Sequence, residues 1–136
     1  MSTAFDLLYS ETEEELRSAV RALLADRCAP ADVLARAETG RPHDPALWHT
    51  LAAEIGAAGL LVPEKLGGQG AGHREAAVVL EELGRAVAPV PYLTSAVLAT
   101  EILLGCDTPD VAGPLRELAA GRQVCVPALP LTQAPG

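Results

Sequence analysis

Apolar residues recur three or four positions apart near the start of the chain, as they do on one face of a helix. The positions concerned are Leu16, Val20, Leu23 and Leu24. Ser10 and Glu13, with an overlapping pair two residues later, are candidates for a capping box immediately before them. The pattern therefore predicts a first helix over about residues 11–27.

Prolines and glycines predict the ends of the next two helices. Pro30 suits the first turn of a short helix that Gly40 would end. Asp44 as the N-cap and Pro45 at the first helical position open the following helix, which ends near Gly56. The apolar face expected for this helix comprises Leu47, Trp48, Leu51, Ala52 and Ile55.

An amphipathic helix is expected from about His73. The stripe predicted to be buried consists of Ala76, Ala77, Leu80, Leu83 and Gly84, and Val78 and Val79 widen the apolar surface. The positions predicted to face solvent are Glu75, Glu81, Glu82 and Arg85. The adjacent acids Glu81 and Glu82 are therefore interpreted as part of a solvated surface.

Pro89 and Pro91 interrupt that helix, and the segment YLTSAVLATEILLG that follows carries a single charge, Glu101. A helix that is apolar on nearly all sides but too short to cross a bilayer belongs in the middle of a bundle or beneath a second domain. The sequence leaves both positions open.

The last part of the chain changes character. A short helix is expected from Thr108 to Gly121, interrupted at Gly113-Pro114. Val124 and Val126 then alternate with other residues, which predicts the start of a β-strand.

These elements together predict an all-α fold, an orthogonal or up-down bundle of about five to six helices over residues 1–122. Residues 123–136 would hold the start of the strand or a tail. Hydrophobic residues make up 49% of the 136 positions but aromatic residues only 3%, so the core must be built from Ala, Leu and Val. Such small side chains suit closely packed helices.

Charge and cysteine content argue against several classes of protein. The formal net charge is −8 and the basic residues are scattered, which argues against nucleic-acid binding. Cys28, Cys106 and Cys125 have no second Cys or His at metal-ligand spacing, so we expect reduced thiols and no metal site. No secretion signal and no membrane-spanning run is recognised. We expect a cytoplasmic protein that does not bind membranes.

The stretch GGQGAG, from Gly67 to Gly72, is a candidate phosphate-binding loop. A Walker loop needs Gly-Lys followed by Ser or Thr, and a dinucleotide fingerprint needs a third glycine where His73 or Glu75 stands. Both templates fail. We interpret the glycines as a tight turn between Pro63 and the next helix, with an anion cradle as the alternative.

No set of residues can be assigned the roles of acid, base and electrophile. The three histidines form none of the usual metal-binding pairs, and no serine lies in a nucleophile elbow. We therefore assign no catalytic residue.

Three short motifs lie in the middle of the chain: GLLVPE at residues 59–64, GGQG at 67–70 and EELGR at 81–85. With these motifs and the opening SETEEELRSAVRALLAD, the chain resembles the N-terminal helical domain of the acyl-CoA dehydrogenase family over about residues 10–132. The resemblance implies that a complete chain adds a middle β-domain and a C-terminal four-helix domain, and oxidises an acyl thioester with FAD. The catalytic glutamate and most flavin contacts of the family lie in those later domains.

The resemblance also supplies candidate site residues. In the family, the helix after Pro91 and the turn before it wall the far end of the acyl pocket. The positions that carry over are Val90, Tyr92, Leu93, Ser95 and Ala96, with bundle core as the alternative role. The ending LTQAPG is similar to the first strand of the middle domain, where the family reads close to LTEPG. Leu131 and Thr132 are therefore the candidates for contact with FAD.

The leading hypothesis is an N-terminal domain, or a split subunit, of an FAD-dependent acyl-CoA dehydrogenase-like oxidoreductase that is inactive alone and works in an oligomer with its missing domains or a partner subunit. One alternative is a stand-alone helical interaction or acyl-binding module without redox activity. Another is a related branch that performs flavin-dependent oxygenation. The leading hypothesis predicts exposed apolar surface between Tyr92 and Leu104.

Overall fold

The computed structural model describes residues 6–130 and 132, which form helices and connecting turns. The α-helices are α1 (Glu11–Arg27), α2 (Pro30–Ala37), α3 (Pro45–His49), α4 (His73–Ala86), α5 (Thr100–Gly105) and α6 (Ala112–Ala119). Two π-helices, η1 (Thr50–Glu54) and η4 (Tyr92–Ala99), continue or precede α-helices, and three short 3-10 helices are η2 (Ala57–Gly59), η3 (Glu64–Leu66) and η5 (Pro109–Val111). The all-α prediction is confirmed.

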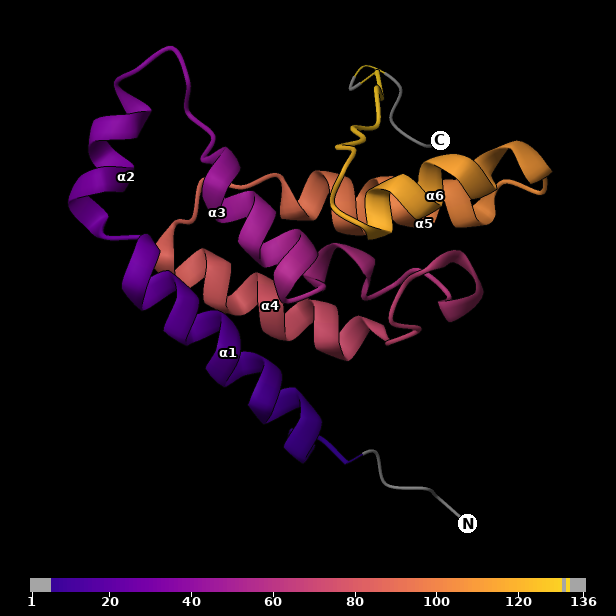
Figure 1. Ribbon diagram of the computed structural model, residues 1–136, viewed down its shortest axis with the longest axis horizontal. Helices are drawn as coiled ribbons and strands as arrows, with labels where there is room; N and C mark the ends of the chain where they lie inside the picture. The colour runs from indigo at the N-terminus through magenta and orange to yellow at the C-terminus, as the bar shows by residue number, and fades with distance from the viewer. Residues whose placement is uncertain (1–5, 131, 133–136) are drawn as a thin grey trace.

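Helix α1 begins at the first of the two predicted capping pairs. Ser10 Oγ accepts a hydrogen bond from the Glu13 N–H at 3.2 Å, and the Glu13 carboxylate accepts one from the Ser10 N–H at 2.7 Å. α1 packs along α4 in the same direction, because Glu13 meets Arg74 near the start of both helices and Cys28 meets Ala86 near their ends. Figure 1 shows the two helices side by side.

The main core lies between α1, α3, η1, η2, α4 and η4. Its fully or almost fully buried side chains include Val20, Leu47, Leu51, Val79 and Tyr92. A smaller cluster lies beneath α5 and α6 and consists of Val62, Ala99, Leu115, Leu118 and Ala119. Figure 1 shows α5 and α6 together at one end of the molecule and α2 at the other.

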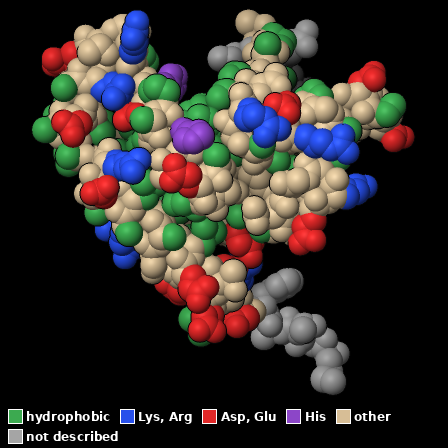
Figure 2. All heavy atoms as spheres, in the orientation of Figure 1, with side chains coloured by type: hydrophobic (Ala, Val, Ile, Leu, Met, Phe, Trp, Pro, Cys, Tyr) green, Lys and Arg blue, Asp and Glu red, His purple; other side chains and the backbone are tan. Residues whose placement is uncertain are grey.

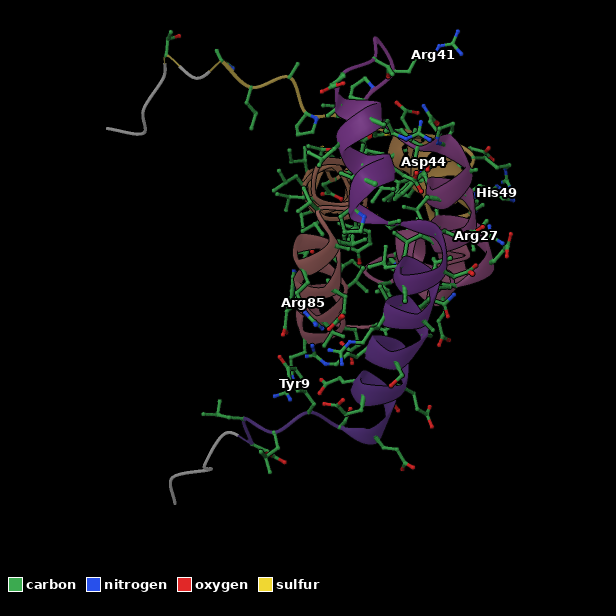
Figure 3. All side chains as sticks on the ribbon, turned by 90° about the vertical axis from the view of Figure 1, so that its left-hand side faces the viewer. Tyr9, Arg27, Arg41, Asp44, His49 and Arg85 are labelled. Carbon is green, nitrogen blue, oxygen red and sulfur yellow. The ribbon has the colours of Figure 1, made fainter. Side chains whose placement is uncertain are left out.

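Helix α2 has no fully buried residue; Val33 packs against the main core, and Arg36 contacts the N-cap of α3. Asp44, the predicted N-cap of α3, accepts hydrogen bonds from the Ala46 and Leu47 N–H groups at 3.1 and 3.0 Å. Its other carboxylate oxygen lies 3.2 Å from the Arg36 guanidinium of α2. Figure 3 shows Asp44 near the junction of these helices.

Two predictions about the end of the chain need correction. Gly113 and Pro114 do not interrupt a helix: they lie in the first turn of α6, where the missing N–H of proline leaves no helical hydrogen bond unmade. The expected strand is not confirmed, because the described residues 123–130 have no regular secondary structure. A strand needs a neighbour to complete its hydrogen-bond ladder.

None of the described helices is both long and apolar enough to cross a membrane.

Candidate functional site

The segment η4–α5 is divided lengthwise into a buried half and an exposed half. The side that faces the cores holds Tyr92, Ser95, Ala96, Ala99 and Thr100, all less than a tenth exposed. The other side holds Leu93, Leu98, Ile102 and Leu104, which are 38–50% exposed. We call these four residues the η4–α5 surface. These apolar side chains are left exposed by the described part of this chain, in a segment whose single charged residue, Glu101, is also exposed and pairs with His73.

The five candidate residues of the acyl pocket are not gathered on that surface. Tyr92, Ser95 and Ala96 are buried in this chain, and Val90 is partly buried against the main core. Leu93 alone among the five is half exposed and belongs to the η4–α5 surface. Contact between these residues and an acyl group stays a prediction.

Two of the buried candidates carry hydroxyl groups in different situations. The Tyr92 hydroxyl has no hydrogen-bond partner among the described residues, and burial raises the pKa of this phenol far above its ordinary value. Ser95 Oγ accepts a hydrogen bond from the Cys125 N–H at 3.1 Å, which anchors the C-terminal segment to η4. Ser95 therefore has a structural role that its sequence position did not reveal.

The C-terminal segment adds further apolar surface. Val124, Val126 and Leu129 are 44%, 65% and 66% exposed. Thr132, one of the two candidates for flavin contact, is exposed, and Leu131 lies outside the described residues. The structure leaves the flavin contact untested.

A cavity of about 450 Å³ lies between α3, the start of η4 and the C-terminal segment. Trp48 and Pro45 form one wall, Pro91 lies at another, and Val124 and Val126 close it from the tail. Figure 2 shows the surface hollowed between the α2 end of the molecule and this segment. None of the five acyl-pocket candidates lines this cavity.

The glycine stretch is a structural turn. The N–H groups of Gly67 to Ala71 all donate to carbonyl oxygens of residues 59–64, so they are not free to bind an anion. Gly67 and Gly70 have φ values of 85° and 59°, which glycine adopts without a steric penalty. A Cβ atom on Gly68 would overlap the Val62 carbonyl oxygen. The turn interpretation is confirmed.

The solvated interpretation of Glu82 is wrong. Its side chain is 2% exposed and lies among three arginines of α1 and α4. Val78 and Val79, predicted to widen the apolar surface of α4, are buried as expected. Glu82 is buried as well, while Ala77 and Gly84 of the predicted stripe are exposed, so the buried face is rotated from the predicted one.

This charged cluster is unsuited to acid–base catalysis. Hydrogen bonds from Arg21 and Arg17 hold the pKa of Glu82 at about 2, so it is ionised and paired near neutral pH. A general base needs a pKa nearer the working pH. Among the described residues, no group of three or more His, Cys, Asp or Glu side chains is placed to hold a metal ion.

Comparisons with known proteins agree on one family. The family profile described as "Acyl-CoA dehydrogenase, N-terminal domain" matches residues 10–110. Acyl-CoA dehydrogenase IpdE2 of Mycolicibacterium smegmatis is 43% identical over 115 residues, which are 85% of this chain and 36% of that protein. IpdE2 of Mycobacterium tuberculosis is 42% identical over 114 residues, which are 84% of this chain and 35% of that protein.

Solved structures show the same likeness in three dimensions. The ChsE4–ChsE5 complex from Mycobacterium tuberculosis contains a chain that matches 96% of this one with a TM-score of 0.83 and 29% identity, over 36% of its own length. A variant of the Tcur3481–Tcur3483 steroid ACAD matches 85% of this chain with a TM-score of 0.78 and 29% identity, over 32% of its own length. This chain thus spans about a third of the length of its relatives.

Proposed function

Because this chain belongs to the acyl-CoA dehydrogenase family and is its N-terminal helical domain, we propose that it walls the acyl pocket of an FAD-dependent enzyme and supports that enzyme's assembly. The missing two thirds of the enzyme would come from further domains or from a partner subunit. The chain alone would be inactive. An acyl thioester would be the substrate of the complete enzyme.

The observation that carries this proposal is the η4–α5 surface. Several large apolar side chains exposed on one short segment are a feature of surfaces that bind another protein or domain. Here the apolar side chains project from a segment whose opposite side is already packed against the two cores of the domain. A covering domain or subunit would therefore remove apolar area from water without disturbing the existing core.

The nature of the covering partner is suggested by the structural neighbours. One neighbour is described as a complex of two differently named subunits, ChsE4 and ChsE5, and another carries a double name of the same kind. We propose by analogy that this chain works in an oligomer with a partner subunit or with its own later domains. The three free cysteines, Cys28, Cys106 and Cys125, support a reducing, cytoplasmic location.

The described residues do not by themselves fit FAD. The glycine turn has no free amide to offer a pyrophosphate, and Arg17, Arg21, Arg74 and Arg122 are held in ion pairs with glutamates of this chain. Arg41, Arg116 and Lys65, the basic residues with no ion pair among the described residues, are scattered along the sequence. We therefore assign FAD binding mainly to the missing part, with Leu131 and Thr132 as the contribution proposed for this chain. FAD, when bound there, would accept the hydrogens removed from the acyl group.

The five pocket candidates would have two different roles in this proposal: direct contact with the acyl group, or support of the residue that makes this contact. Leu93 would touch the acyl group directly, because it is the candidate that is already exposed on the η4–α5 surface. Val90, Tyr92, Ser95 and Ala96 would lie behind it and fix its position. The unpaired Tyr92 hydroxyl supports a pocket nearby, because a buried polar group without a partner costs about 1–3 kcal/mol unless a ligand completes it.

The test compares the chain alone with the chain co-expressed with the reading frame encoded next to it. Alone, the purified protein is expected to retain no flavin absorbance and to oxidise no acyl-CoA, including a steroid-derived one. Co-expression is expected to yield a complex with bound flavin and acyl-CoA oxidation. Full flavin occupancy in the isolated chain would contradict the proposal.

A stand-alone interaction or acyl-binding module is the second candidate, favoured by the two cores that this chain closes by itself. Size-exclusion chromatography with light scattering separates the two functions. A monomer without a dye-accessible apolar surface favours the module, whereas self-association favours a domain that lacks its partner.

Oxygenation of the substrate in place of dehydrogenation would appear as oxygen incorporation by the assembled enzyme.

A further inference from the structure

The cavity between α3, η4 and the C-terminal segment has the dimensions of a small-molecule site. Its volume of about 450 Å³ falls within the range of roughly 300–1,000 Å³ that ligand pockets occupy. Its walls come from three parts of the sequence that are far apart, represented by Trp48, Pro91 and Val126. Protein-docking surfaces are broader and flatter, so the concave shape favours a small ligand over a protein segment.

Two polar groups at the edge of the cavity, on Asp44 and Thr94, are already engaged within the chain. The buried Trp48 indole N–H has no hydrogen-bond partner among the described residues, and His43 also lines the cavity. The Asp44 carboxylate accepts two backbone N–H groups of α3 and pairs with Arg36. The Thr94 hydroxyl donates to the Pro91 carbonyl oxygen at 3.4 Å. The Trp48 indole N–H can donate one hydrogen bond to a ligand, whereas the Arg36 guanidinium is already paired with Asp44. An uncharged ligand with one acceptor is therefore favoured over an ion, which would lose its hydration without a free counter-charge there.

The wall formed by the tail is held in place rather than lying loosely against the helices. The Cys125 N–H donates to Ser95 Oγ, and Ser95 is completely buried. Cys125 also packs against the smaller core cluster, while its neighbours Val124 and Val126 line the cavity with Trp48 and Pro91. The hydrogen bond and this packing together hold the residue that lies between the two valines.

We propose that this cavity binds a small, uncharged, apolar molecule. The inference rests on this chain alone and holds whether or not the η4–α5 surface is covered by a partner. Apolar burial supplies the affinity, and the pairing of Arg36 with Asp44, which leaves this arginine unavailable to an anion, supplies the selectivity against anions.

Trp48 makes the proposal directly measurable, because it is the single tryptophan of the chain. The probe is ω-bromodecanol, an uncharged chain whose bromine quenches indole fluorescence on contact. Titration of the full chain is expected to give saturable quenching. The anion ω-bromodecanoate is expected to bind at least about tenfold more weakly, because the Asp44 carboxylate repels it and the Arg36 guanidinium nearby is already paired with Asp44.

Two substitutions on the same segment form a matched pair. Val126 and Leu129 are 65% and 66% exposed, but only Val126 lines the cavity. Val126→Asp is expected to weaken probe binding at least about tenfold, since it places a charge in an apolar wall. Leu129→Asp should leave binding unchanged. Ser95→Ala, which frees the tail, should weaken binding while helical circular dichroism stays intact.

Three results would overturn the proposal: no saturable quenching by ω-bromodecanol, equal binding by the Val126→Asp and Leu129→Asp variants, or equal affinity for the alcohol and the anion. None of these results bears on flavin retention or acyl-CoA oxidation in the assembled enzyme. Failure of this inference is therefore distinguishable from failure of the proposed function.

Discussion

Glu82 holds α1 against α4 through charged hydrogen bonds. Its carboxylate lies 2.9 Å from Arg17, 2.7 Å from Arg21 and 3.2 Å from Arg85. Removing one partner from a buried charge cluster costs about 3–5 kcal/mol, and the low end applies because Arg21 and Arg85 reach solvent. We expect Glu82→Gln to lower the free energy of unfolding in urea by about 3 kcal/mol.

Glu81 provides the control, because it is the neighbouring residue and pairs with Arg17, but its side chain is half exposed. Exposed ion pairs contribute little to stability. Glu81→Gln should therefore shift the unfolding midpoint far less than Glu82→Gln. Equal shifts for the two variants would show that burial of Glu82 does not set the strength of the α1–α4 contact.

The pH dependence of stability follows from the same residues. Arginine hydrogen bonds lower the pKa of Glu82 and of Glu13 from 4.5 to about 2. As the pH falls, these carboxylates are protonated in the unfolded state before they are protonated in the folded state. The free energy of unfolding should therefore be highest above pH 4.5 and should decrease as the pH falls toward 2. Urea unfolding between pH 7 and pH 3 tests this, and Glu82→Gln should flatten the decline.

Val87 ends α4 in the left-handed region, with φ 49° and ψ 44°. Glycine is usual at this position, and a non-glycine residue there costs roughly 1–3 kcal/mol. Its side chain is 71% exposed, so little packing is lost on its removal. Val87→Gly should raise the unfolding free energy by about 1 kcal/mol in thermal and urea denaturation, after allowing for the flexibility of glycine in the unfolded chain. Val126→Gly, at an exposed position without positive φ, should give no such gain.

At the scale of elements, the glycine turn fixes how η2 meets the start of α4. Gly68 packs directly against the Val62 backbone, so Gly68→Ala should destabilise the domain by roughly 2 kcal/mol or more through overlap with that carbonyl group. Gly84, inside α4 with open space around it, is the matched control. Gly84→Ala should stabilise by roughly 0.5–1 kcal/mol, and the opposite order in thermal unfolding would refute this account of the turn.

The sequence predicted the starts of those helices whose capping residues lie next to them in the chain. The start of α1 at Ser10 and the start of α3 at Asp44 depend on side chains within three residues of the cap, so the sequence suffices to place them. The buried face of α4 was misplaced because Glu82 is compensated by arginines 61 and 65 positions away, and that pairing exists only after folding. The π-helical form of η1 and η4 likewise left no signal in the spacing of apolar residues.

At the scale of the whole molecule, apolar composition predicted that the segment after Pro91 would be packed, but not against what. In the structure, one side of η4–α5 packs against the core and the other side is exposed, so the segment combines the two predicted positions, within the bundle and beneath a second domain. The acyl-pocket candidates Tyr92, Ser95 and Ala96 fall on the core side. Which side a residue takes depends on the rotation of the helix, which the neighbouring helices and α6 determine.

The η4–α5 surface should determine whether the isolated chain binds an apolar dye and self-associates. Leu98 and Ile102 are one helical turn apart and are 42% and 46% exposed, so the double variant Leu98→Gln/Ile102→Gln removes the centre of the η4–α5 surface without opening a core. We expect lower binding of an apolar dye and less self-association in light scattering. Leu34→Gln, on the exposed side of α2, is the control and should change neither. If both variants behave alike, the apolar surface that attracts a partner lies elsewhere on the domain.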